Sequence, residues 1–206
     1  MFVEQEFEEK RPEEIQRIIA DFPLASIVAN TSEGLIAEHV PLMLQENSHL
    51  FGHVSLNNAL FKSVLQNHAV LCIFKADDAY ISANYYPSKF QDHKKVPTWN
   101  YQVVHVYGEI AFFSDDKTKL AMLGKLTKYQ EQKTNGQQAW KMSDAPKDYL
   151  LGMLKDLVAF KIKITKVVAK SKLSQNREPA DFENVVKELQ AKGHDRLASS
   201  MSMLER

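Results

Sequence analysis

The residues best suited to chemistry in this chain lie where a loop ends and a β-rich segment begins. Trp99, Asn100 and Tyr101 stand in the stretch from Val96 to Gly108, directly after the turn signal at Pro97. A flat aromatic ring, an amide with donor and acceptor atoms, and a phenol are the groups that hold a planar polar ligand. The alternative for Trp99 is a plain packing anchor at the end of a barrel.

A second polar cluster follows the last predicted strand. Its members are Lys172, Ser174, Gln175, Asn176 and Arg177. Two cations and three neutral polar side chains so close together suit a phosphate or the polar edge of a flavin-like ring. The competing interpretation is a solvated loop that joins a strand to a helix. Either cluster alone is weak support for a site, whereas together they are hard to explain as ordinary surface.

A third group of polar residues stands where another strand opens a helix. His53, Ser55, Asn57 and Asn58 occupy this junction. Free backbone N–H groups at a helix N-terminus attract phosphate, and these side chains add further donors. Two simpler interpretations compete with this one. Asn57 or Asn58 is a helix N-cap, and His53 is a structural histidine.

The elements that must position these clusters are short strands, with helices inserted between runs of them. Periodicity predicts strands at 24–29, 35–44, 49–54, 69–75, 79–83, 101–113 and 158–168. It predicts helices at 12–22, from 57 or 58 to 65, at 115–132, near 147–155 and around 182–189. Strands at this spacing do not form a βαβ repetition. The pattern indicates a mainly β fold, an antiparallel barrel with helical decoration.

The simplest partition of the chain is one domain with a C-terminal extension. Residues 1–170 form the barrel domain, and residues 171–206 form a loop and a helical extension packed on it. The polar tail beyond Gly193 is expected to be loose. The polar loop from Tyr85 to Pro97 is long for a compact domain, and loops of this length are often functional.

Composition limits the classes of function. The 206 residues carry 26 basic and 26 acidic side chains, so the chain lacks the electrostatic footprint of nucleic-acid binding. The single cysteine, Cys72, cannot form an intramolecular disulfide or a zinc cluster, and His39 and His105 lack metal-ligand spacing, so no metal is assigned. The sequence has no run of about 20 apolar residues, so no membrane span is expected. Together with a Glu-rich start, this predicts a cytoplasmic protein without a secretory signal.

Several segments of the chain resemble the PaiB family of FMN-binding proteins. They are 97–101 followed by 103–108, Tyr80–Ser82, Tyr86–Lys89 and Lys172–Arg177. They occur in the order that the family has, and the resemblance covers most of the chain. The Pro-Thr-Trp-Asn-Tyr and Lys-Leu-Ser-Gln-Asn-Arg elements are quite specific.

The resemblance implies a split β-barrel related to pyridoxamine-phosphate oxidases and flavin reductases, with FMN at the interface of a homodimer. The cofactor-binding residues expected from it and from the clusters above are His53, Ser55, Asn57, Asn58, Lys62, Trp99, Asn100, Lys172, Ser174, Gln175 and Arg177. One departure matters. Where the family is expected to show an Arg and an Asn-Pro, this chain has Leu56 and Asn58-Ala59. Lys62, Lys172 or Arg177 then supplies the phosphate-binding cation, or the FMN affinity is low.

The family is named for negative transcriptional regulators, so the resemblance implies a repressor that acts through flavin binding. The charge balance and the lack of a recognisable helix-turn-helix argue against direct reading of DNA. The alternative is an FMN-dependent oxidoreductase, either a flavin reductase or an enzyme like pyridoxamine-phosphate oxidase, in which FMN carries the redox chemistry. A haem-binding or haem-degrading relative is the weakest option. The sequence leaves open whether the chain is an enzyme, and it names no catalytic residue.

Overall fold

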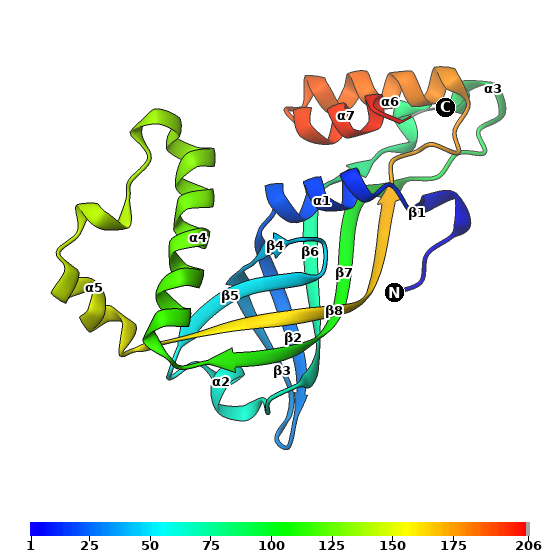
Figure 1. Cartoon of the computed structure of the whole chain (residues 1–206). Coiled ribbons are helices and arrows are strands. Elements are labelled where there is room, and N and C mark those ends of the chain that lie inside the picture. The colour runs from blue at the N-terminus through cyan, green and yellow to red at the C-terminus, as the bar shows by residue number, and fades with distance from the viewer. Residues whose placement is uncertain (205–206) are drawn as a thin grey trace. The chain divides into compact units, whose positions relative to one another are not determined.

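The fold is built on one eight-stranded sheet (Figure 1). The computed structural model describes residues 1–204, with every side chain among them except that of Asp92. Hydrogen-bonded strands follow the order β3-β2-β6-β7-β8-β5-β4, and β1 pairs with β8. The strands are β1 (Glu8–Glu9), β2 (Leu24–Thr31), β3 (Gly34–Pro41), β4 (Met43–Gln45), β5 (His49–Ser55), β6 (His68–Ile81), β7 (Thr98–Phe113) and β8 (Leu157–Lys172). Antiparallel pairing and added helices confirm the predicted class, mainly β with helices.

Helices occupy the connections between strands and the C-terminal part of the described chain. They are α1 (Pro12–Asp21), α2 (Ala59–Ser63), α3 (Lys89–Asp92), α4 (Asp116–Asn135), α5 (Lys147–Leu154), α6 (Pro179–Ala191) and α7 (Asp195–Ser202). Single 3₁₀ turns include η1 (Gln5–Phe7), η3 (Gly136–Gln138) and η4 (Met142–Asp144). Asp115 caps α4, because its side chain accepts a hydrogen bond from the Thr118 N–H at 2.9 Å. Within residues 1–204, no helix has the length and apolar character needed to cross a bilayer.

The chain divides into two compact units. The first comprises residues 1–21, 75–104 and 168 onward, and the second comprises residues 22–74 and 105–167. β6, β7 and β8 contribute residues to both units. The predicted boundary between a barrel domain and an extension, after residue 170, stays a prediction.

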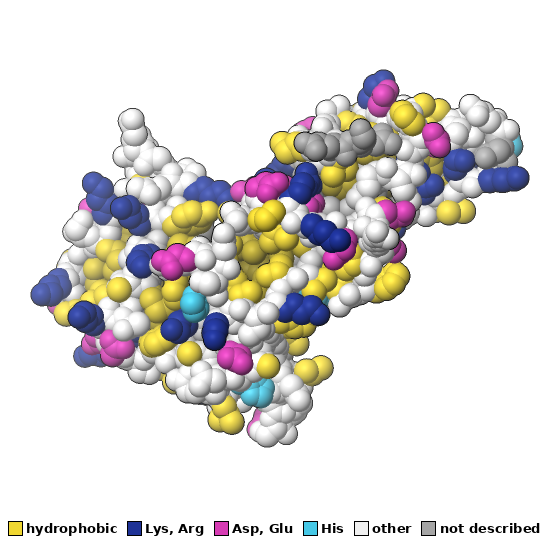
Figure 2. Space-filling view, turned by 45° about the vertical axis from the view of Figure 1, so that its right-hand side comes forward, with side chains coloured by type: hydrophobic (Ala, Val, Ile, Leu, Met, Phe, Trp, Pro, Cys, Tyr) yellow, Lys and Arg dark blue, Asp and Glu magenta, His cyan; other side chains and the backbone are white. Residues whose placement is uncertain are grey.

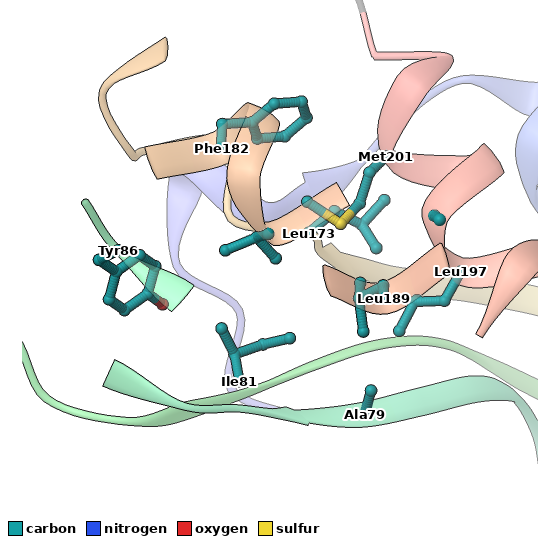
Figure 3. Close-up of a cluster of buried hydrophobic side chains, with 10 residues drawn as sticks. Ala79, Ile81, Tyr86, Leu173, Phe182, Leu189, Leu197 and Met201 are labelled. Atoms are coloured by element: carbon teal, nitrogen blue, oxygen red, sulfur yellow. The ribbon is translucent and has the colours of Figure 1, made fainter. Parts of the chain in front are cut away.

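A hydrophobic cluster forms the core of the first unit (Figure 3). α6 and α7 bury Leu189, Leu197 and Met201, which are at most 1% exposed, together with Ile81 from β6. The predicted loose tail beyond Gly193 is therefore wrong. Gly193, with φ +79°, ends α6, and α7 follows at once. An eight-residue helix is marginal alone, so its order comes from this packing.

The second unit buries one face of β7. Val106, Ile110 and Phe112 are at most 8% exposed. Gly108 of β7 lies directly against β8. A Cβ at this position would lie 2.5 Å from the Lys163 carbonyl oxygen and 2.5 Å from Ile162 Cγ2. Glycine is needed here because any side chain would force the two backbones apart.

One strand covers the segment for which the sequence predicts two. β6 continues through Asp77 and Asp78, which the predicted strands at 69–75 and 79–83 left as a break. Both carboxylates are paired, because Asp78 lies 2.6 Å from the Lys75 ammonium and Asp77 lies 3.0 Å from the Arg196 guanidinium. These pairs let two residues of low β-propensity remain inside a strand.

Candidate functional site

Two of the three predicted polar clusters meet at one cavity in the first unit. The cavity has a volume of about 120 Å³, and the start of β7, the end of β8 and the loop after β8 contribute most of its wall. The lining residues are Phe7, Thr98, Asn100, Lys172, Ser174, Asn176 and Arg177. We call this the Asn100–Ser174 pocket. Its walls come from segments 74 residues apart in the chain, so the fold brings together what the sequence could only suggest.

A buried hydrogen bond joins the two clusters. Asn100 is fully buried and Ser174 is 3% exposed. The Asn100 Nδ2 donates to Ser174 Oγ at 2.9 Å, and it also lies 3.6 Å from Met201 Sδ. Ser174 has φ +61°, a left-handed conformation that non-glycine residues rarely adopt and that often marks functional loops. The Asn100 amide therefore has hydrogen-bond partners within the chain. It stays a candidate for ligand binding because it lines the pocket.

The pocket is cationic. The Lys172 ammonium donates to Thr98 Oγ1 at 2.8 Å, and the Arg177 guanidinium lies 4.8 Å from the centre of the Tyr86 ring. Among the described residues, no carboxylate lines the cavity. Two cations and neutral hydrogen-bonding groups without a lining acid form a site for an anion such as a phosphate.

The N-terminal segment lies against the same loop. Phe7 is 5% exposed, and its ring lies 5.6 Å from the Lys172 ammonium. The Glu6 carboxylate accepts a hydrogen bond from Asn176 Nδ2 at 2.9 Å. Glu4 forms an ion pair with Lys170, which lowers the pKa of Glu4. An acidic segment therefore borders the cationic pocket.

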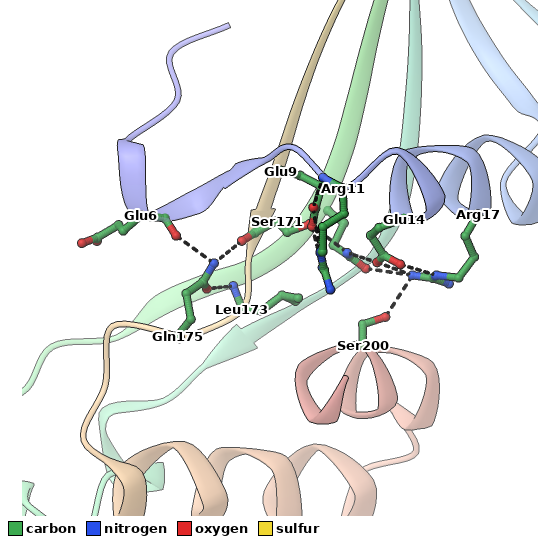
Figure 4. Close-up of polar contacts among 10 residues, drawn as sticks. Glu6, Glu9, Arg11, Glu14, Arg17, Ser171, Leu173, Gln175 and Ser200 are labelled. Carbon is green, nitrogen blue, oxygen red and sulfur yellow. Dashed lines mark hydrogen bonds and ion pairs between the residues drawn. The ribbon is translucent and has the colours of Figure 1, made fainter. Parts of the chain in front are cut away.

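Gln175 holds the loop rather than lining the cavity (Figure 4). Its Oε1 accepts from the Leu173 N–H at 2.8 Å, and its Nε2 donates to the Ser171 carbonyl at 2.7 Å and to the Glu6 carbonyl at 3.1 Å. These bonds fix the loop that carries Ser174 and Arg177. A direct role for Gln175 in ligand binding stays a prediction.

Trp99 lies outside this pocket and outside the core. It is 52% exposed, and its ring meets that of Tyr80 edge-on, with centroids 5.8 Å apart. Because side chains alternate along a strand, Trp99 points to the face opposite Asn100. The pair exposes aromatic surface on β6 and β7. A ligand role for Trp99, against the alternative of a packing anchor at the end of the barrel, stays a prediction.

The third predicted cluster belongs to the second unit. Asn58 is the N-cap of α2, because its Oδ1 accepts from the Leu60 N–H at 2.8 Å, and its Nδ2 donates to Glu38 at 3.1 Å. Ser55 Oγ accepts from the Asn57 N–H at 3.1 Å. Lys62 is exposed. The simpler interpretation, capping, is what Asn58 visibly does, and a ligand-binding role for Ser55, Asn57, Asn58 and Lys62 stays a prediction.

His53 lines a different cavity, of about 280 Å³, which also includes Leu42, between β3 and β4, and Leu126 from α4. Its Nδ1 is buried and has no hydrogen-bond partner among the described residues. Burial lowers the pKa of His53 below its usual value of 6.5, so the ring is neutral at pH 7. A neutral imidazole does not attract a phosphate by charge, and its predicted cofactor role would rest on hydrogen bonding.

Sequence reasoning misses two lining residues. Thr98 is two residues before Asn100, and strand alternation alone places both on one face. Phe7 had no signal in the sequence, because its contact with the loop after β8 depends on the pairing of β1 with β8. Among residues 1–204, no group of three or more His, Cys, Asp or Glu side chains could hold a metal ion.

Comparison with known proteins assigns the chain to a family. Residues 1–166 match the sequence model of a family described as "Putative FMN-binding domain". The chain belongs to this FMN-binding family. The "Protease synthase and sporulation protein PAI 2" of Bacillus subtilis is 32% identical over 193 residues, which is 92% of this chain and 89% of that protein. The resemblance to the PaiB family is thereby confirmed.

Relatives of this chain also occur in fungi. An uncharacterised Aspergillus fumigatus protein is 26% identical, covering 92% of this chain and 88% of its own. Among solved structures, the FAD and haem binding protein of Mycobacterium smegmatis has a TM-score of 0.58 at 14% identity and covers 80% of this chain and 73% of its own. The conserved hypothetical protein Rv2991 of Mycobacterium tuberculosis has a TM-score of 0.61 at 7% identity, with coverage of 86% and 94%. These likenesses concern the fold alone, and they agree with the predicted split barrel.

Proposed function

We propose that this chain binds FMN and that the Asn100–Ser174 pocket holds its phosphate. The observation that carries the proposal is the convergence of Lys172 and Arg177 with neutral polar groups on a cavity without a lining acid. Charge-assisted hydrogen bonds to phosphate are about twice as strong as neutral ones. This chain has Leu56 where the PaiB family is expected to show an arginine. Lys172 and Arg177 of the pocket can supply the missing cation.

The volume of the pocket limits what it holds. About 120 Å³ accommodates a phosphate group, whereas sites for ligands of the size of a flavin span roughly 300–1,000 Å³. The ring of FMN must therefore lie outside this cavity. When bound, FMN supplies the redox-active ring, and the residues of this chain bind its phosphate and orient it.

The spectrum of the purified protein, together with paired ligand titrations, tests this proposal. We expect flavin absorbance, and we expect FMN to bind about 100-fold more tightly than riboflavin, because two charge-assisted contacts depend on the phosphate. A haem spectrum without flavin would overturn FMN binding. Equal affinities for FMN and riboflavin would show that the pocket does not bind the phosphate.

Regulation is the proposed biological role. The related Bacillus subtilis protein is named for protease synthesis and sporulation. By analogy, this chain would be a cytoplasmic repressor whose effect depends on its bound flavin. The balance of 26 basic and 26 acidic residues supports an indirect effect on transcription. Figure 2 shows Lys and Arg side chains interspersed with acidic ones on the face in view, rather than gathered into the stripe that DNA binding needs.

We further propose a homodimer with FMN at the subunit interface. The support is the small pocket, which leaves the flavin ring to be covered from outside, and the exposed Tyr80–Trp99 pair in the same unit. Sedimentation at micromolar concentration is expected to give a dimer. A monomer that retains FMN would contradict this.

Replacing Trp99 by Phe separates a ligand role from a packing role. Trp99 is 52% exposed, so we expect the free energy of unfolding of the FMN-free protein to change by at most about 0.5 kcal/mol. If the ring lies against the flavin, the affinity for FMN or the fluorescence of bound flavin changes. Loss of thermal stability with unchanged flavin binding would assign Trp99 to packing alone.

A further inference from the structure

The second unit contains a larger cavity that no residue of the proposed flavin site touches. It has a volume of about 390 Å³, within the range of small-molecule sites. One wall is a face of α4, where the lining residues recur at helical spacing, and the other is the segment after η3. The lining residues are Gly124, Thr127, Lys128, Gln132, Ala139, Trp140, Lys141 and Met142. We call this the α4 cavity.

Gly124 and Trp140 give the α4 cavity its room and its flat apolar surface. A Cβ built on Gly124 would lie 3.5 Å from Met142 Sδ, in ordinary van der Waals contact, so a side chain larger than a methyl group would take up space in the cavity. Trp140 is 42% exposed although it lines a cavity. A large aromatic ring left half in solvent can bury more apolar area by stacking on a planar ligand.

Hydrogen bonds to Glu131 hold the Trp140 segment against α4. The Glu131 Oε2 accepts from the Trp140 N–H at 2.9 Å and from Asn135 Nδ2 at 2.7 Å, and these bonds lower the pKa of Glu131. Asp144 is engaged in a similar way, because its Oδ2 accepts from the Lys141 N–H at 2.9 Å. Both nearby carboxylates therefore accept hydrogen bonds from N–H groups of the chain. These bonds fix the cavity wall, so the wall is preformed.

The charge at the α4 cavity is positive. Lys128 and Lys141 line it, and the lining residues include no acid within the described part of the chain. No ion pair of either ammonium group occurs within residues 1–204. Two lysines beside an indole ring are suited to a planar ring that carries an acidic group.

We propose that the α4 cavity is a second ligand site, for a planar aromatic anion such as an aromatic carboxylate or sulfonate. The ring stacks on Trp140, and the acidic group lies between Lys128 and Lys141. The site is separate from the Asn100–Ser174 pocket, and the proposal does not depend on flavin binding there. Its occupant would be an effector of the protein rather than its cofactor.

A fluorescent aromatic sulfonate, 1-anilinonaphthalene-8-sulfonate, tests the proposal on the full chain. The chain has two tryptophans, so a Trp99→Phe background leaves Trp140 as the donor for energy transfer to the bound probe. We expect Lys128→Gln with Lys141→Gln to weaken binding of the probe by about ten-fold or more. The matched control is Lys117→Gln with Lys125→Gln, which removes the same charge from exposed positions of α4 outside the cavity. An equal loss in both double variants would overturn the site.

Two further measurements make the result specific. N-phenyl-1-naphthylamine has the same rings without the sulfonate, and its binding should be unchanged by the Lys128 and Lys141 replacements. Gly124→Leu should abolish binding of both probes while the protein stays folded, because leucine fills the cavity and favours a helix more than glycine does. Unchanged sulfonate binding in Gly124→Leu would contradict the proposal. So would displacement of the sulfonate by FMN, since FMN is itself a planar anion and would then share the cavity.

Discussion

Replacing Lys172 or Arg177 by alanine is expected to weaken FMN binding by about ten-fold each, and replacing both by about 100-fold. Each side chain lines the Asn100–Ser174 pocket, and a charge-assisted hydrogen bond contributes about 1.5–3 kcal/mol. Flavin fluorescence titration of the four proteins measures the effect. Riboflavin should bind the parent and the variants equally, because it lacks the phosphate that these cations are proposed to hold.

Lys187→Ala is the matched control for the loss of charge, because Lys187 is exposed on α6 and does not line the pocket. The Arg177 guanidinium also lies over the Tyr86 ring, so the thermal unfolding of the FMN-free Arg177→Ala protein must be measured beside its affinity. Arg177→Lys keeps the charge but loses the planar guanidinium, and it should retain more affinity than alanine. Parent-like FMN titrations in both Lys172→Ala and Arg177→Ala would place this loop outside the site.

Local sequence patterns predicted the elements of the site well. The predicted strand at 101–113 lies within β7, and the polar clusters that contain Asn100 and Ser174 were visible in the sequence although their contact was not. Their spacing in the chain is 74 residues, and no local pattern specifies which distant segments pair. The meeting of the two clusters follows from strand order, which composition and periodicity do not determine.

The errors have the same origin. Asp77 and Asp78 looked like a break in a strand because both have low β-propensity, and the partner of Asp77, Arg196, is distant in the sequence. The end of the described chain looked loose because α7 is short and polar overall. Leu197 and Met201 lie one turn apart and are at most 1% exposed, so packing supplies the order that intrinsic propensity lacks. Residues held by tertiary contacts are the ones that a single sequence hides.

A second large effect is expected at the buried polar network of the first unit, where α1 meets β7 and β8 (Figure 4). Glu14 Oε1 accepts from Gln102 Nε2 at 2.7 Å, and the Glu14 carboxylate accepts from Arg17 twice at 2.8 Å. Gln102 Nε2 also donates to Ser171 Oγ at 2.9 Å. Gln102 and Ser171 lie close in sequence to Asn100 and Ser174, so this network supports the strands that carry the pocket.

Replacing Glu14 by alanine should lower the free energy of unfolding by about 1–3 kcal/mol, because the buried Gln102 amide and the partly buried Arg17 guanidinium each lose one of their acceptors. The hydrogen bond from Arg17 lowers the pKa of Glu14 below its ordinary value of 4.5. The stabilisation is therefore complete above that ordinary value and is lost as the pH falls through the lower pKa of the folded state. Denaturant unfolding at neutral and acidic pH measures both effects, with Glu13→Ala, exposed on the same helix, as the control. The network does not hold this unit together if two results are found. Glu14→Ala and Glu13→Ala would lower the free energy of unfolding equally, and both variants would lose stability at acidic pH as the parent protein does.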